Sequence, residues 1–307
     1  WNLTCKILNL MSNNPILHRL SQLVSLLLGA RIFVLALFTF TLYVSTIFLF
    51  NQEESLRKFV FDYKVHGIIL CAMLSIAAGG IINRFYDKEK DEVEKPFRSR
   101  LQSFLKEKYF LYSYVILNVF SLGISAVLSW RIFIFFLIYQ FIIWFYSHKL
   151  SKMLIINNLT FVSLTLYPFF GLLVYYKHFS YKLFLMAAFL FLIMLTIDLI
   201  KDVLTSNVDR VFGYNTIANV FGKKVSYIVI GFVIFANVLV SILLLFFIPK
   251  TNYMLGYFSL SILFFVMMSF PILTYQKSKL FWVINFFRIW VFIGVIFMLL
   301  NGIFERF

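Results

Sequence analysis

Nine runs of apolar residues, separated by short polar segments, organise the chain. A helix needs about 20 apolar residues to cross the hydrocarbon core of a bilayer, and most of the runs are close to that length. The pattern therefore predicts an all-α, polytopic membrane protein with nine transmembrane helices. The predicted spans cover residues 23–50, 66–82, 109–130, 132–147, 153–176, 182–200, 225–248, 253–275 and 280–304.

Composition agrees with this pattern, because 62% of the 307 residues are hydrophobic and only 13% are charged. The run over residues 23–50 is too long for the apolar region of a signal peptide, and no small-residue cleavage site follows it. We expect it to be a retained first span. The predicted organisation is an N-terminal cytoplasmic segment over residues 1–22 and a single membrane domain over residues 23–307.

Lysine and arginine are distributed unequally between the two sides of the predicted spans. With the N-terminus on side one, that side holds 18 of the 28 basic residues, the other side holds 8, and Arg31 and Arg288 lie inside spans. Basic residues accumulate in cytoplasmic loops, so side one is expected to be cytoplasmic, in the inner (plasma) membrane of a bacterium. The net charge of +15 mainly reflects this topology, and no basic–aromatic pattern favours nucleic acid as a partner.

A first group of polar residues ends the second apolar run. Asn83, Asp87 and Asp91 are spaced i, i+4 and i+8, which places them within about 80° of arc on one helix face. Pro96 ends the helix beyond the acids and turns a basic cluster, Lys95, Arg98 and Arg100, back toward them. Acids that bind magnesium, beside bases that bind phosphate oxygens, predict a diphosphate site.

A second group lies at the end of the sixth run. Asp202 and Asp209 fall within about 40° of Asp198 if the helix continues through Ser206, and Lys201 and Arg210 add positive charge nearby. Carboxylates near lipid are costly unless they meet a cation or another partner. Mg²⁺ prefers one or two carboxylates together with phosphate and water. Two such groups on one side of the membrane predict two Mg²⁺ ions that hold one diphosphate.

These groups resemble the signature of the UbiA superfamily of intramembrane prenyltransferases. Its first motif is normally N-D-x-x-D-x-x-x-D followed by K-P-x-R, and its second is D-x-x-x-D…D-R-x-x-G-x-x-T…G. Matching residues of the first motif are Asn83, Asp87, Asp91, Lys95, Pro96 and Arg98. Those of the second are Asp198, Asp202, Asp209, Arg210, Gly213, Thr216 and Gly222.

Between the two motifs, a third segment is similar to the family's Y-S-x-x-L-K sequence after the fourth span. It consists of Tyr146, Ser147, Leu150 and Lys152, and Asn158 and Gly171 fall where the fifth span of the family usually has Asn and Gly. The resemblance covers nearly the whole chain. One departure is that Arg84 replaces the first Asp of the family motif, which puts a cation in the expected metal site.

The resemblance implies Mg²⁺-dependent transfer of a prenyl chain from an allylic prenyl diphosphate to a small acceptor. It also implies an apolar chamber enclosed by the nine helices, in which an allylic cation is protected from water. Asp87, Asp91, Asp198 and Asp202 are the expected catalytic and metal-binding residues. The expected substrate-binding residues are Asn83, Arg84, Lys95, Arg98, Tyr146, Lys152, Asn158, Lys201, Asp209 and Arg210.

Several alternatives remain open from the sequence. An aromatic acceptor of the quinone-precursor type is the first choice, and a glycerol-phosphate ether lipid precursor is the second, because the DLIKD segment is most similar to that branch. Arg84 itself either contacts the diphosphate or points to solvent. A cation transporter that uses intramembrane acids and an inactive paralogue are the alternatives from other classes.

The charge distribution generates a first test. Residues 83–100 and 198–224 are both expected to be cytoplasmic, with the C-terminus outside. Single cysteines placed at Ser99 and Ser206 should be labelled by a membrane-impermeant reagent only after the membrane is opened. Labelling of either position from outside intact cells would contradict the nine-span orientation.

Overall fold

The computed structural model describes residues 15–50, 56–177, 179–249, 252–274 and 276–306. Among these residues, nine helices are long and apolar enough to cross a membrane, so the prediction of an all-helical, nine-span membrane protein is confirmed. The chain divides into two compact units. Unit 1 contains the described residues up to Thr39 and His66–His148, and unit 2 contains Phe40–Val65 and the residues from Lys149 onward.

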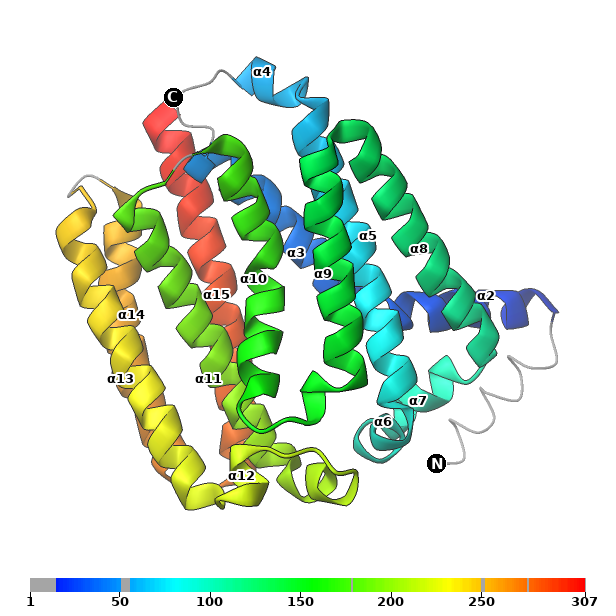
Figure 1. The fold of residues 1–307 in the computed structure, drawn as a ribbon. Coiled ribbons are helices and arrows are strands. Elements are labelled where there is room, and N and C mark those ends of the chain that lie inside the picture. Colours follow the sequence, from blue (N-terminus) through cyan, green and yellow to red (C-terminus); the bar gives the residue numbers. More distant parts are fainter. Residues whose placement is uncertain (1–14, 51–55, 178, 250–251, 275, 307) are drawn as a thin grey trace. The chain divides into compact units, whose positions relative to one another are not determined.

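Unit 1 is built around three long helices, α5 (Tyr63–Tyr86), α8 (Glu107–Leu128) and α9 (Trp130–His148) (Figure 1). Buried polar side chains join them. The hydroxyls of Ser75 and Ser121 lie 3.0 Å apart, the Gln140 amide donates to Ser75 at 3.2 Å, and the Cys71 thiol donates to the Ser121 carbonyl. Such hydrogen bonds hold helices together where lipid provides no hydrophobic driving force between them.

Three shorter helices also belong to unit 1: α2 (Pro15–Gly29), α6 (Lys88–Glu94) and α7 (Pro96–Gln102). Helix α2 packs against α7, and the Ser25 hydroxyl donates to the Leu101 carbonyl at 2.5 Å. The first span was predicted to begin at residue 23, which is wrong. Helix α2 ends at Gly29, Arg31 has a φ of 53°, and the spanning helix α3 (Ile32–Ser45) begins after this turn. Apolar composition does not reveal such a turn, because residues 26–28 before it and residues 32–34 after it are all apolar.

Unit 2 is a bundle of five long helices with α11 at its centre. Helix α11 (Tyr181–Val211) packs against α10 (Ile156–Tyr176), α13 (Lys223–Phe247) and α15 (Lys277–Arg306), and α14 (Tyr253–Leu273) packs against α13 and α15. The unit also contains the π-helical turn η1 (Thr46–Phe50), the 3₁₀ turn η2 (Leu150–Lys152) and the short helices α4 (Leu56–Val60) and α12 (Ile217–Val220).

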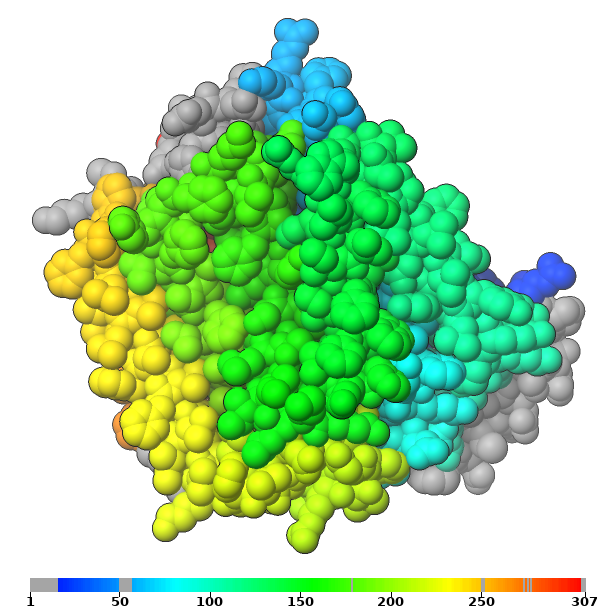
Figure 2. Space-filling view, in the orientation of Figure 1, coloured from blue at the N-terminus to red at the C-terminus, as the bar shows by residue number. Residues whose placement is uncertain are grey.

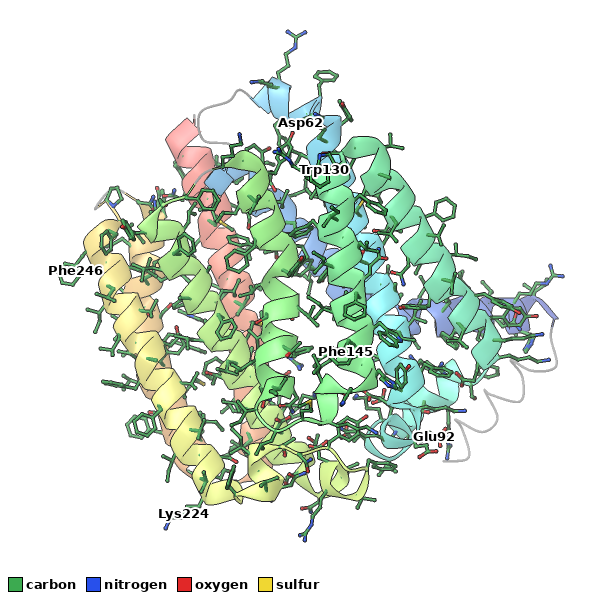
Figure 3. The ribbon with its side chains drawn as sticks, viewed as in Figure 1. Asp62, Glu92, Trp130, Phe145, Lys224 and Phe246 are labelled. Atoms are coloured by element: carbon green, nitrogen blue, oxygen red, sulfur yellow. The ribbon has the colours of Figure 1, made fainter. Side chains whose placement is uncertain are left out.

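The outer surface of unit 2 is apolar, as a lipid-facing surface should be. Phe232, Phe235 and Phe246 on α13 are all largely exposed, and α13 forms the yellow surface in Figure 2. Figure 3 shows Phe246 pointing away from the bundle near one end of α13, with Lys224 at the other end. A charged end and an apolar body are expected of a helix that leaves the membrane on the side of its lysines.

Helix α11 continues 11 residues beyond the predicted span end at residue 200. The condition that the helix continues through Ser206 is therefore met, and Asp198, Asp202 and Asp209 all lie on one long helix. The predicted division into residues 1–22 and 23–307 stays a prediction. Residues 1–14 lie outside the described residues, and α2 runs across the proposed boundary.

Close packing between α5 and the end of α2 generates a second test. A Cβ at Gly80 would lie 2.9 Å from the carbonyl oxygen of Gly29, whereas a Cβ at Gly123 would meet nothing within 4 Å. Gly80→Ala should lower the free energy of unfolding by about 1–3 kcal/mol, because backbone must move. The control Gly123→Ala should change it by about 1 kcal/mol or less, toward greater stability. Unfolding in detergent micelles measures both, and equal effects would contradict the packing.

Candidate functional site

The first acidic group lies in unit 1, at the junction of α5 and α6. Helix α5 ends at Tyr86 and Asp87 is the N-cap of α6, but helical hydrogen bonds continue across the junction. The Asp87 amide donates to the Asn83 carbonyl at 2.9 Å, and the Asp91 amide donates to the Asp87 carbonyl at 2.8 Å. The three residues therefore keep the predicted helical register. The Asn83 side chain donates to Asp87 Oδ2 at 2.7 Å and so orients this carboxylate.

Two residues of the basic cluster that follows, Lys95 and Arg98, bind different partners. Helix α6 ends at Glu94, just before Pro96, as predicted, and Pro96 begins α7. Lys95 Nζ forms an ion pair with Asp91 at 2.7 Å. Arg98 instead donates to the Leu28 carbonyl of α2 at 2.6 Å, where the C-terminal end of a helix attracts a cation. Burial lowers the pKa of the Arg98 guanidinium, as does the nearby Arg31, whereas the Asp91 carboxylate raises it.

Arg84, the departure from the family motif, is buried among residues of unit 1. Its guanidinium forms an ion pair with Glu107 at 3.3 Å and approaches the Gln102 carbonyl at 3.5 Å. Its Cζ lies 3.8 Å from the centre of the Phe110 ring, within the range of a cation–π contact. Arg84 does not point to solvent, and a contact with diphosphate stays a prediction. Arginine often forms ion pairs and aromatic stacks of this kind.

The second acidic group lies on α11 in unit 2 and is buried. Asp198, Asp202 and Asp209 are only 6%, 7% and 1% exposed. A single amide joins the first two, because Asn158 Nδ2 of α10 donates to Asp198 Oδ2 and to Asp202 Oδ2, each at 2.8 Å. The Thr205 hydroxyl donates to Asp209 Oδ2 at 2.6 Å. Local and long-range hydrogen bonds thus compensate for the burial of these carboxylates.

Basic residues surround this second group at its edge. Lys201 Nζ lies 3.8 Å from Asp198 Oδ1, and its side chain is nearly half exposed. Arg210 is also exposed. The Lys152 carbonyl accepts a hydrogen bond from the backbone N–H of Asn215 at 3.2 Å, and the Lys152 ammonium lies over the Tyr214 ring. Exposed cations beside buried acids are suited to binding an anion such as a phosphate.

The donor set fits Mg²⁺ better than a metal that needs a full protein cage. Within the described ranges, no group of three or more His, Cys, Asp or Glu side chains could enclose an ion. Each acidic group offers two carboxylates one helical turn apart and an amide beside them, and Asn158 Oδ1 is buried without a hydrogen-bond partner among the described residues. Mg²⁺ is commonly held by one or two carboxylates and completes its shell with phosphate and water.

Some contacts at these sites were not predicted from the sequence. Glu107 as the partner of Arg84 and Thr205 as the partner of Asp209 are the clearest examples. A buried arginine requires an acid, but the first loop contains six acids and the sequence does not distinguish them. Tyr146 lies half-buried in the last turn of α9. Ser206 is buried, so the adjacent, exposed Asn207 is the better position for topology labelling, in a background without Cys5 and Cys71.

Nine apolar helices of membrane-spanning length among the described residues, with one acidic group beside the end of α5 and another on α11, define a polytopic membrane protein. Residues 57–292 match the family described as the UbiA prenyltransferase family. Because this match covers most of the chain, the protein belongs to the UbiA prenyltransferase family. The membership predicted from the two motifs is confirmed.

Individual relatives are more distant. Over 181 residues the chain is 27% identical to digeranylgeranylglyceryl phosphate synthase of Pyrococcus horikoshii, and this match covers 57% of the chain and 63% of that relative. A solved structure of digeranylgeranylglyceryl phosphate synthase is 19% identical, with a TM-score of 0.70 over 92% of this chain and 99% of that one. A UbiA homolog from Archaeoglobus fulgidus bound to GPP and Mg²⁺ is 14% identical, with a TM-score of 0.66 over 89% and 98%. At these identities the two structures establish the fold alone.

The two cations that pair with Glu107 provide a third test. Arg84 and Lys88 both lie 3.3 Å from this carboxylate, but their side chains are 7% and 48% exposed. Arg84→Met should lower the free energy of unfolding by about 1–3 kcal/mol, because it leaves a partly buried acid without its arginine. Lys88→Met should cost less than about 1 kcal/mol. Unfolding in detergent micelles measures both, and similar losses would show that Arg84 does not stabilise unit 1 in this way.

Proposed function

We propose that the protein catalyses Mg²⁺-dependent transfer of a prenyl group from an allylic prenyl diphosphate to an acceptor. The observation that carries the proposal is the buried group of Asp198, Asp202 and Asn158 in a chain of the UbiA prenyltransferase family. Buried carboxylates in a membrane helix are expensive and are generally functional. Solved UbiA homologs from Archaeoglobus fulgidus are bound to GPP or DMAPP together with Mg²⁺, which supports the same donor class here.

Asp87 and Asp91 in unit 1 and Asp198 and Asp202 in unit 2 are the proposed Mg²⁺ ligands. Bound Mg²⁺ would neutralise the charge that develops on the leaving diphosphate. Asn83 orients Asp87 for this role through its 2.7 Å hydrogen bond. That the two acidic groups serve one diphosphate stays a prediction, as does the enclosing apolar chamber. The further residues proposed to contact the substrates are Arg84, Lys95, Arg98, Tyr146, Lys152, Asn158, Lys201, Asp209 and Arg210.

The basic residues divide into two kinds by their present contacts. Lys201 and Arg210 are exposed, and if Lys201 moves from Asp198 to a phosphate oxygen, Asp198 keeps its hydrogen bond from Asn158. Lys95 would first release Asp91, and Arg98 would first release the Leu28 carbonyl. When Mg²⁺ binds a carboxylate, it replaces the positive charge of the side chain that was paired there, so the release of that side chain costs little free energy. We therefore assign Lys95, Lys201 and Arg210 the main part in diphosphate binding.

For the acceptor, we propose a glycerol-phosphate ether lipid precursor ahead of an aromatic quinone precursor. The relative from Pyrococcus horikoshii is a digeranylgeranylglyceryl phosphate synthase. The DLIKD segment, which begins at Asp198, is most similar to the ether-lipid branch of the family. An aromatic acceptor is the second candidate. The protein is an integral membrane protein, and we propose that its acidic helix ends face the cytoplasm, because basic residues are concentrated on that side.

Purified protein with a labelled prenyl diphosphate, Mg²⁺ and each acceptor class tests the proposal. Transfer should require Mg²⁺ or Mn²⁺, and Asp202→Asn should lower kcat/KM about 100-fold or more, because charge stabilisation at the leaving group is lost. The matched control is Glu92→Gln on α6, an exposed acid visible in Figure 3, which should change the rate less than about twofold.

Three outcomes would contradict the proposal. Turnover that does not depend on a divalent cation would remove the role of the acids. Absence of transfer to either acceptor class, with metal and donor bound, would favour an inactive paralogue. Metal-coupled cation flux in proteoliposomes without transfer would favour the transporter alternative. Preference for a prenylated glyceryl phosphate over aromatic acids decides between the two acceptors.

A further inference from the structure

Asn158 joins two buried carboxylates through one nitrogen atom. Its side chain is 1% exposed, and both of its amide hydrogens are used, one for Asp198 Oδ2 and one for Asp202 Oδ2, at 2.8 Å each. The two acids are one helical turn apart on α11, where like charges repel. The amide group, with its partial positive charge on the N–H side, thus occupies the place that a cation would take between them.

The oxygen of the same side-chain amide has no part in joining the two acids. Asn158 Oδ1 is buried and accepts no hydrogen bond from any described residue. Turning the amide by half a turn about its Cβ–Cγ bond would exchange Oδ1 and Nδ2, and no hydrogen bond at the Oδ1 end would be lost. Only the two bonds to the carboxylates hold the amide in its present orientation, because carboxylate oxygens accept hydrogen bonds and do not pair with another acceptor.

The two distances from Asn158 Nδ2 to the carboxylate oxygens match the spacing of neighbouring ligands in a metal coordination shell. In an octahedral Mg²⁺ site with bonds of about 2.1 Å, neighbouring ligand oxygens lie about 3 Å apart. Asn158 Nδ2 is already 2.8 Å from one oxygen of each acid. The half turn would put Oδ1 at that position, where it could be a neighbouring ligand to both carboxylates with hardly any movement of the backbone.

We propose that Asn158 is a metal ligand that exchanges roles when Mg²⁺ binds. In the metal-free protein its N–H groups hold Asp198 and Asp202 together, and when the ion arrives the amide turns and presents Oδ1 to the metal. This inference rests on the proposed function, since it requires Mg²⁺ at these two acids. The uncharged Asn158 side chain thus has two roles: it holds Asp198 and Asp202 together without metal, and it contributes to the affinity of these acids for the ion.

The backbone at the start of α10 favours a side-chain turn over a movement of the helix. The backbone N–H of Asn158 donates to Asn157 Oδ1 at 2.6 Å. Ile155, directly before the helix, has a φ of 64°, which is unusual for a β-branched residue and indicates that surrounding contacts determine the path of the chain here. With the main chain held in this way, the torsion angles of Asn158 itself are the available freedom.

The direct test observes the amide. Protein labelled with ¹⁵N and ¹³C in its asparagine side chains is titrated with MgCl₂ in detergent micelles, and Asn158→Leu identifies the signals of this residue. Without Mg²⁺, the Asn158 NH₂ protons should be shifted downfield by their two carboxylate partners. Saturating Mg²⁺ should move them upfield and shift the side-chain carbonyl carbon. The matched control is Asn237, fully buried in α13, whose signals should not change.

A second measurement uses affinity. Asn158→Leu should weaken Mn²⁺ binding, measured by electron paramagnetic resonance, about 10-fold or more, and should lower the melting temperature of the metal-free protein. Asn237→Leu should leave the affinity unchanged. If Asp202→Asn abolishes Mn²⁺ binding but the Asn158 amide keeps its signals when Mg²⁺ is bound, the exchange is wrong and the proposed function stands. If the wild-type protein binds neither ion, both are wrong.

Discussion

Carboxylates at the end of a membrane-spanning helix need a hydrogen-bond donor or a cation, and the arrangement of unit 2 depends on this requirement. Asp198 and Asp202 are buried on α11, where an unpaired charge would cost several kcal/mol or more. The Asn158 amide satisfies both acids and thereby fixes the start of α10 against α11. Helix α11 in turn packs against α13 and α15. The hydrogen bonds of Asn158 therefore position α10 on α11, the helix against which the other long helices of unit 2 are arranged.

The two acidic groups satisfy the same requirement by different means. In unit 1, Asp87 and Asp91 are half-buried, and their partners Asn83 and Lys95 lie four residues away on the same chain segment. Such local contacts form wherever the helix forms, and water and salt weaken them. In unit 2, Asp198 and Asp202 are nearly inaccessible, and they share a partner, Asn158, that comes from another helix. The second group is therefore the better organised of the two, since its geometry is held by tertiary packing.

Arg84 shows how the fold accommodates a residue that departs from the family motif. The cation stands where the family normally has an acid, and a positive charge beside Asp87 would oppose metal binding. In unit 1 the guanidinium is instead paired with Glu107 and stacked on Phe110. Its charge is thereby balanced by an acid outside the motif, and Asn83 remains free to hold Asp87. The substitution thus links α5 to the start of α8, and it leaves the hydrogen bond between Asn83 and Asp87 intact.

The sequence by itself determined the helical class, the number of spans, the register of Asn83, Asp87 and Asp91, and the break at Pro96. Each of these follows from local composition, from a spacing of four residues or from the geometry of proline. It did not determine the turn at Arg31, which divides one apolar run into α2 and α3, or the extension of α11 to Val211. It also did not identify Glu107 as the partner of Arg84, or assign Asn158 to the acids 40 and 44 residues further along the chain. These features depend on which helices pack together, and helix packing in an apolar bundle is decided by side-chain shape and by a few buried hydrogen bonds that a hydrophobic pattern does not encode.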